Sequence, residues 1–152
     1  MKNQSRLLDD EVKELVDRLR HLERERYKTL VLCGPPLTGK TKLAMAVCET
    51  YGAHYVDVTS EVLPMTKSPT LGVYGADEFR SWIKSRMKSL RSSLCVDEVE
   101  PLLATFPERH LLSLFGMMQR LENPYPLLFV TRFENVLHRS NFPSERVHYV
   151  TR

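Results

Sequence analysis

Long apolar runs, paired cysteines and a strong charge of either sign are all missing from this sequence of 152 residues. No stretch approaches the roughly 20 apolar residues that a membrane helix needs, and the polar start through Arg6 does not resemble a signal peptide. The three cysteines, Cys33, Cys48 and Cys95, lack the close C-x-x-C pairing of metal sites. We therefore expect a cytoplasmic protein with free, buried thiols and no membrane partner.

The charge balance is only mildly basic. Lys and Arg number 22 against 19 Asp and Glu, a formal net charge of +3, which does not by itself indicate nucleic acid. Hydrophobic residues make up 42% of the chain, enough apolar material for one packed core at this length. We predict a single core over residues 27–152, preceded by a helical extension over residues 1–26.

Two hydrophobic periods divide the chain into alternating helices and strands. Apolar residues at steps of three and four over residues 7–26 predict an amphipathic N-terminal helix. Short apolar runs predict buried strands at 29–33, 53–58, 92–96, 126–131 and 146–150. Helical spacing predicts further helices at 40–50, 77–91 and from 107 to before Asn123, with an irregular loop over 60–75. This alternation predicts an α/β fold with a mostly parallel sheet covered by helices.

A phosphate-binding loop lies between the first predicted strand and the helix that follows it. Residues 34–41 read Gly-Pro-Pro-Leu-Thr-Gly-Lys-Thr and match the pattern G-x-x-x-x-G-K-[ST]. The glycines let successive N–H groups point inward around phosphates, Lys40 reaches the β- and γ-phosphates, and the Thr41 hydroxyl ligates Mg²⁺. The predicted cofactors are therefore ATP and Mg²⁺, and the absence of a guanine-reading N/T-K-x-D string favours adenine. The predicted nucleotide-binding residues are Gly34, Pro35, Pro36, Leu37, Thr38, Gly39, Lys40, Thr41, Lys42 and Thr131.

Two further predicted strands end on polar residues that should face the same crevice as the loop. Asp97 and Glu98 follow the run Leu-Cys-Val, so that Asp97 can hold Mg²⁺ with Thr41 while Glu98 acts as general base. Glu100 is the poorer candidate base and is expected to be solvated. Arg132 follows Thr131 at the tip of the fourth strand, where a guanidinium can sense the γ-phosphate. The predicted catalytic residues are Glu98, Lys40 and Arg132, and the predicted metal ligands are Thr41 and Asp97.

Together these features resemble the P-loop ATPases with an additional strand and a catalytic glutamate, in the AAA+ and STAND branches. Val130-Thr131-Arg132 is similar to the fourth-strand signature of STAND switch ATPases. The resemblance covers most of residues 27–150 and implies a three-layer fold with the sheet order 5-1-4-3-2. A short core without a helical lid, with one helix ahead of its first strand, resembles the small BrxF ATPases of BREX phage-defence systems. The missing lid predicts slow ATP hydrolysis in isolation, and the resemblance implies work with other subunits of a defence or remodelling complex, or with further copies of the chain.

Several basic residues allow more than one interpretation. Arg80, Lys84 and Lys88 share one face of the predicted helix 77–91, where they suit DNA phosphates, an acidic partner or simply solvent. Arg139 and Arg146 fall where AAA+ proteins tend to place an arginine that acts on a neighbour's nucleotide, so either is a candidate to act in trans.

Two other function classes share the same loop. A small-molecule kinase uses a P-loop scaffold, although adjacent carboxylates at Asp97 and Glu98 suit activation of water better than phosphoryl transfer to an acceptor. A scaffold that binds nucleotide without hydrolysis, or an ATPase that loads onto DNA through the basic helix, is the remaining alternative.

Overall fold

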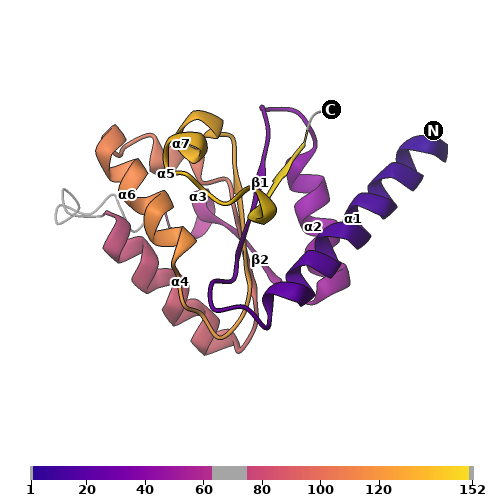
Figure 1. Cartoon of the computed structure of the whole chain (residues 1–152), viewed down its shortest axis with the longest axis horizontal. Coiled ribbons are helices and arrows are strands. Elements are labelled where there is room, and N and C mark those ends of the chain that lie inside the picture. Colours follow the sequence, from indigo (N-terminus) through magenta and orange to yellow (C-terminus); the bar gives the residue numbers. More distant parts are fainter. Residues whose placement is uncertain (1, 63–74, 151–152) are drawn as a thin grey trace.

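Helices and strands alternate along the chain, and the computed structural model describes residues 2–62 and 75–150 (Figure 1). The strands are β1 (Thr29–Cys33), β2 (His54–Asp57), β3 (Leu94–Asp97), β4 (Leu127–Thr131) and β5 (Val147–Tyr149). The helices are α1 (Lys2–Leu22), α2 (Lys40–Tyr51), α3 (Val58–Glu61), α4 (Ala76–Leu90), α5 (Glu100–Leu103), α6 (Glu108–Gln119) and α7 (Glu134–Arg139), with a 3-10 turn η3 (Ser144–Arg146). All five predicted strands are present within a few residues of their predicted bounds.

The five strands form one sheet in the order β2-β3-β4-β1-β5, which confirms the order 5-1-4-3-2 and the α/β class. Every pairing is parallel, and the register places Cys33 beside Thr131 and Asp57 beside Asp97. The carboxyl ends of β1, β2, β3 and β4 therefore meet at one edge of the sheet, which is the edge where α/β proteins place their ligands.

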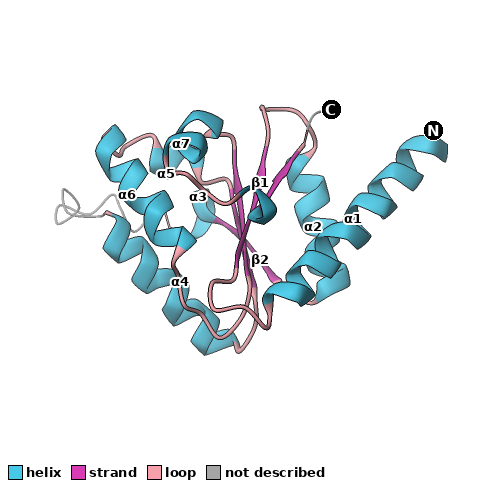
Figure 2. Cartoon of the chain, viewed as in Figure 1, coloured by secondary structure: helices cyan, strands magenta, loops and turns pink. Residues whose placement is uncertain are grey.

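Both faces of the sheet are buried, because alternate strand residues join two separate hydrophobic clusters. Leu30 and Leu32 pack with α1 and α2 on one face, whereas Val31 packs with α4 and α6 on the other. Figure 2 shows the same arrangement, with the strands between the two groups of helices. Burial on both faces explains why the strands read as continuous apolar runs, and it confirms the three-layer fold.

Helix α1 packs against α2 and contributes five buried residues to the cluster on that face: Val12, Leu15, Val16, Leu19 and Leu22. The helix begins at Lys2 and ends at Leu22, earlier at both ends than the predicted 7–26. Residues 23–26 are all exposed, so no buried side chain anchors a further turn of the helix. The N-terminal segment thus shares a hydrophobic cluster with the core that follows it, and the division at residue 26 stays a prediction.

Three short helices were not predicted, because four to six residues are too few to show a hydrophobic period. Helix α3 takes over from β2 at Val58, where the Asp57 carboxylate accepts a hydrogen bond from the Ser60 N–H at 3.3 Å. Ser60 and Glu61 are therefore helical rather than part of the predicted loop 60–75, and residues 63–74 of that loop lie outside the described residues. Helices α5 and α7 follow the ends of β3 and β4 and help to shape the site described below.

The three cysteines are free and buried, as predicted. Burial raises the pKa of the Cys33 thiol to about 11, so this group stays protonated near neutral pH. Over residues 2–62 and 75–150, no helix combines the length and the apolar character that crossing a bilayer would require.

The packing of α1 gives a first prediction. Leu19 is 1% exposed, so Leu19→Ala should lower the free energy of unfolding by about 2–5 kcal/mol through lost burial and a residual cavity. Leu7 on the same helix is 60% exposed, so Leu7→Ala is the matched control and should change stability little. Urea unfolding followed by circular dichroism measures both. Equal effects of the two changes would show that α1 is not part of the folded core.

Candidate functional site

The P-loop begins where β1 ends, and two close contacts fix its start. The Gly34 N–H donates to the Thr131 carbonyl at 3.3 Å, which ties the loop to the tip of β4. A Cβ at Gly34 would lie 2.6 Å from the Val150 carbonyl oxygen, so only glycine fits beside the chain that follows β5. Gly39, just before α2, has φ 84 in the left-handed region. Both glycines of the pattern are therefore required by the backbone.

The side chains of Thr38 and Lys40 both turn back to one carbonyl of the loop. The Thr38 hydroxyl donates to the Pro35 carbonyl at 2.8 Å, and the Lys40 ammonium donates to the same oxygen at 2.6 Å. The Lys40 ammonium thus lies folded over the loop, at the N-terminus of helix α2. A cation there, next to a helix N-terminus, makes the loop a site for an anion such as a nucleotide phosphate.

Asp97 is the best-bonded side chain of the site. Its Oδ2 accepts from the Thr41 hydroxyl at 2.7 Å and from the Tyr55 hydroxyl at 2.7 Å, and its Oδ1 accepts from the Glu98 N–H at 2.7 Å. The Asp97 residue is only 3% exposed, so these three donors replace the water that it has lost. The structure therefore brings together the two predicted metal ligands, which lie 56 residues apart in the chain.

Tyr55 was not predicted from the sequence. It lies on β2 beside Cys95 of β3 in the parallel register, two positions before the pair Asp57 and Asp97. Burial, followed by the hydrogen bond to Asp97, raises the pKa of the Tyr55 hydroxyl, so it stays protonated and donates. The only sequence signal was a polar-tipped aromatic within an apolar run, and that signal does not identify the partner.

Glu98 follows Asp97 in an unusual backbone conformation. Its φ is 56, in the left-handed region, and its carbonyl accepts from the Thr59 hydroxyl at 3.0 Å. The residue is exposed and lines the same cavity as Lys40 and Thr41. A non-glycine residue held with positive φ at a strand tip is a recurrent feature of functional sites, and here it directs the Glu98 carboxylate to the cavity side of Asp97.

Glu100 lies in the cavity wall, and the expectation that it is solvated was wrong. The residue is partly buried, and its Oε2 has no hydrogen-bond partner within the described part of the chain. Burial raises the pKa of the Glu100 carboxyl to about 7, against the lowering effect of Arg132. The reason is helix α5, which starts at Glu100 and turns the side chain back toward the cavity instead of leaving it on a surface loop.

The tip of β4 supplies one group that faces the cavity and one that faces inward. Thr131 is fully buried and its hydroxyl oxygen accepts from the Phe133 N–H at 3.1 Å, so it shapes the turn after the strand. Arg132 is exposed and lines the cavity. Lys42 is also exposed, but it lies on α2 outside the cavity lining.

These groups surround one open cavity of about 680 Å³ at the carboxyl edge of the sheet. Its size is within the range of small-molecule and cofactor sites. It is lined by Pro36, Leu37, Gly39, Lys40, Thr41, Asp97, Glu98, Glu100, Pro101, Ala104 and Arg132. All five predicted catalytic and metal-binding residues therefore line a single cavity.

The two arginines considered as groups acting in trans make contacts within the chain. Arg139 forms an ion pair with Glu108 of α6. The Arg146 guanidinium donates to the Gln119 carbonyl at 2.9 Å and lies over the Phe142 ring, 5.3 Å from its centroid. Burial lowers the pKa of Arg146 from its ordinary high value. Arg146 is thus engaged in holding η3 to α6, and Arg139 is the more exposed of the two.

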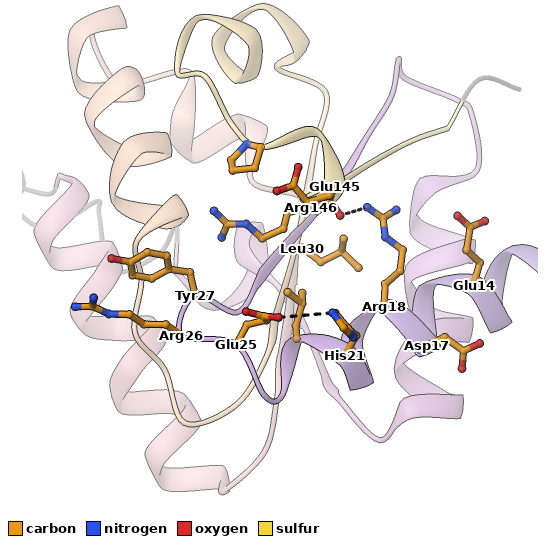
Figure 3. Close-up of a pocket in the computed structure, with 12 residues that line it drawn as sticks. Glu14, Asp17, Arg18, His21, Glu25, Arg26, Tyr27, Leu30, Glu145 and Arg146 are labelled. Atoms are coloured by element: carbon orange, nitrogen blue, oxygen red, sulfur yellow. Dashed lines mark hydrogen bonds and ion pairs between the residues drawn. The ribbon is translucent and has the colours of Figure 1, made fainter.

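A second cavity, of about 610 Å³, lies at the amino edge of the sheet between α1, the start of β1 and η3 (Figure 3). Its charged side chains are largely paired with the protein itself. Arg18 bonds the carbonyls of Glu145 and Val147, and His21 lies 3.6 Å from the Glu25 carboxylate. None of the P-loop residues lines it. This cavity is separate from the nucleotide-type site.

Comparison with known protein families agrees with the geometry. The family model described as "ATPase family associated with various cellular activities (AAA)" matches residues 30–142, which is more than half of the chain. The match runs from β1 to just after α7 and includes the P-loop, Asp97, Glu98 and Arg132. No match was found among curated proteins.

The raised pKa of Glu100 predicts how stability responds to pH. Folding raises this pKa from about 4.5 to about 7, so the folded state resists ionisation of the carboxyl. This penalty is absent below the unfolded pKa and grows as pH rises from 4.5 to 7. Glu100→Gln removes the charge, so it should raise the melting temperature at about pH 8 and change it little at about pH 4.5.

Because Glu100 is partly exposed, we expect a gain on the order of 1 kcal/mol, or roughly 2–4 °C, at the higher pH. Differential scanning calorimetry at the two pH values measures the shift. Glu49 on α2 is exposed, so Glu49→Gln is the matched control. A Glu100→Gln variant that melts with the wild type at both pH values would contradict the burial of this carboxyl.

Proposed function

We propose that this chain, which belongs to the AAA family of ATPases, binds ATP with Mg²⁺ and hydrolyses it as a subunit of a larger assembly. Nucleotide binding of the ATPase type follows from the family. The magnesium requirement, the roles of individual residues and the assembly are the parts that we propose.

The observation that carries the proposal is the 2.7 Å contact between the Thr41 hydroxyl and the Asp97 carboxylate. One group belongs to the P-loop and the other to the tip of β3, and both line the cavity that contains Lys40. A phosphate-binding loop and a buried carboxylate meeting at one point are the two halves of a metal–nucleotide site. A chance glycine-rich turn would not bring a buried acid to its threonine.

The oxygen donors at this point suit Mg²⁺, which prefers oxygen ligands and keeps several waters. Thr41 and Asp97 would hold the ion, directly or through water, and Tyr55 would keep the Asp97 carboxylate oriented from behind. A bound Mg²⁺ supplies charge neutralisation at the β- and γ-phosphates. Lys40 would leave the Pro35 carbonyl for these phosphates, since both are acceptors within reach of its flexible side chain.

Hydrolysis needs a base for the attacking water and a cation for the charge on the γ-phosphate. Glu98 is exposed in the cavity and would act as the general base, and Arg132, at the tip of the neighbouring strand β4, would be the cation. Arg132 also connects to α7, because its carbonyl accepts from the Glu134 N–H at 2.8 Å. Through this turn a change at Arg132 would be transmitted to α7, as expected of a switch.

An exposed leucine at the site supports the proposal that the chain is a subunit of a larger assembly. Leu37 lies at the tip of the P-loop, is 103% exposed and has φ 63, a strained conformation for a leucine. In this proposal the Leu37 side chain, held in solvent beside the nucleotide cavity, would contact another protein surface. Together with the resemblance to BrxF, this supports a role as a cytoplasmic subunit of a BREX-type antiviral complex. A methyltransferase and a large phosphatase-like protein encoded beside this chain would support that role.

Two substitutions separate binding from hydrolysis. Lys40→Ala should abolish binding of a fluorescent ATP analogue, since it removes the phosphate-binding cation. Glu98→Gln should bind the analogue like the wild type and lower phosphate release by about 10²–10⁴-fold, the contribution of a general base. Glu49→Gln, an exposed glutamate on α2, is the matched control and should retain full activity.

The same assay tests the alternatives. With γ-labelled ATP and a panel of small acceptors, label should appear only as free phosphate, and transfer to an acceptor would identify a kinase instead. Unchanged phosphate release by Glu98→Gln would remove Glu98 from its role. Rapid turnover by the purified monomer would contradict the proposal that the chain works as a subunit of a larger assembly.

A further inference from the structure

Four cations lie on and directly after helix α4, and none of them has a partner among the described residues. Arg80, Lys84 and Lys88 recur every fourth residue, and Arg91 follows at the end of the helix. Across residues 2–62 and 75–150, none of the four forms an ion pair or a side-chain hydrogen bond. Arg86 on the same helix differs, because it pairs with Glu61 at 2.9 Å. The row from Arg80 to Lys88 is roughly 12 Å long at about 1.5 Å per residue.

Three of these cations line a hollow of about 430 Å³ between the end of α4 and the segment before β4. The other lining residues are Glu122, Asn123, Pro124 and Tyr125. Glu122 is the one acid of this lining, and its carboxylate is bound to Arg26 at 2.6 Å and 2.7 Å. The hollow is therefore strongly positive, because its only acid among the lining residues already pairs with Arg26.

Asn123 in the wall of the hollow has unsatisfied hydrogen-bonding groups. The residue is 5% exposed, and within the described part of the chain neither its Oδ1 nor its Nδ2 has a partner. A buried amide without partners is destabilising, so its presence in a native fold asks for an explanation. An amide N–H₂ beside three cations is a donor for an oxyanion. Arg91 adds a second costly feature, since its φ of 52 is one that glycine usually adopts at a helix end.

The hollow lies at the end of the molecule opposite the nucleotide cavity. Arg91 precedes β3 and Asn123–Tyr125 precede β4, so both belong to the amino edge of the parallel sheet, whereas the P-loop follows β1 at the carboxyl edge. In Figure 1, α4 runs down the picture, away from the loop between β1 and α2 at the top. A ligand here would leave the nucleotide cavity open.

We propose that the hollow and the cationic row of α4 bind the phosphodiester backbone of DNA. One phosphate lies in the hollow against Lys84, Lys88 and Arg91, and the strand continues along α4 past Arg80. A linear row of point charges matches the regular spacing of backbone phosphates, and a hollow with an amide donor matches a compact oxyanion. An acidic protein would present carboxylates at irregular spacing and would have no need of the hollow.

Fluorescence anisotropy of a labelled 30-base-pair duplex tests this site on the full chain. The wild type should bind with an affinity that falls steeply with salt, since each phosphate contact contributes about −0.9 to the slope of log K against log salt. Lys84→Gln combined with Lys88→Gln should weaken binding roughly tenfold or more and reduce that slope by about two contacts. Asn123→Leu should also weaken binding while raising the melting temperature, because it removes the unsatisfied amide without changing the charge.

The control variant, Lys13→Gln combined with Arg109→Gln, removes the same charge from two exposed positions on α1 and α6 and should bind DNA like the wild type. Binding of the ATP analogue shows that every variant is folded, because none of these residues lines the nucleotide cavity. Equal DNA binding by the Lys84→Gln, Lys88→Gln variant and by the control variant would overturn the proposal. Labelled poly-glutamate is a second test. If it binds as tightly as DNA and this binding is lost in the Lys84→Gln, Lys88→Gln variant, the proposal is also overturned, because the surface would then be a site for an acidic protein.

Discussion

The buried carboxylate of Asp97 is the constraint on which the site depends. Removing an ionised carboxylate from water is costly unless donors replace the water, and here the donors come from three different elements. Thr41 belongs to α2, Tyr55 to β2, and the Glu98 N–H to the chain after β3. Through these three hydrogen bonds, Asp97 links the start of α2 to strands β2 and β3 and holds the backbone of Glu98, the candidate base. Breaking a buried charged network of this kind typically costs about 3–5 kcal/mol, so fold and site are stabilised together.

Much of this arrangement is readable from the sequence, because the signals are local. The apolar run of β1 reflects burial on both faces of the sheet, and the glycines of the P-loop reflect backbone positions where a side chain does not fit or is strained. Asp97 is predicted from its position at the end of the apolar run of β3. What could not be read depends on contacts between distant segments. Nothing in the sequence places Tyr55 against Asp97, and Glu100 reads as a solvated acid until the short helix α5 turns it toward the cavity. Short helices lack a hydrophobic period, so both their existence and their effect on neighbouring side chains escape a pattern-based prediction.

The two charged surfaces of the molecule lie at opposite ends of the same strand. Strand β3 runs from Leu94, three residues after Arg91, to Asp97, a distance of roughly 10 Å at about 3.3 Å per residue. Within the described residues, the cations at the amino edge have no charged partner, while the carboxyl edge carries the loop, the buried acid and the exposed Leu37. With this division, the proposed DNA site and the proposed nucleotide site would be separated by the sheet and could be occupied at once.

Thr41 and Asp97 are proposed to form a metal–nucleotide site, and the magnesium dependence of ATP binding is its most direct test. Isothermal titration calorimetry compares ATP binding with and without Mg²⁺ for the wild type and for Asp97→Asn, which keeps the shape and an acceptor for Thr41 and Tyr55. Mg²⁺ should strengthen ATP binding to the wild type by about tenfold or more, a gain of at least about 1.4 kcal/mol. The variant should bind ATP in the absence of Mg²⁺ and lose that gain. An Asp97→Asn variant that keeps the full magnesium effect would contradict the central claim.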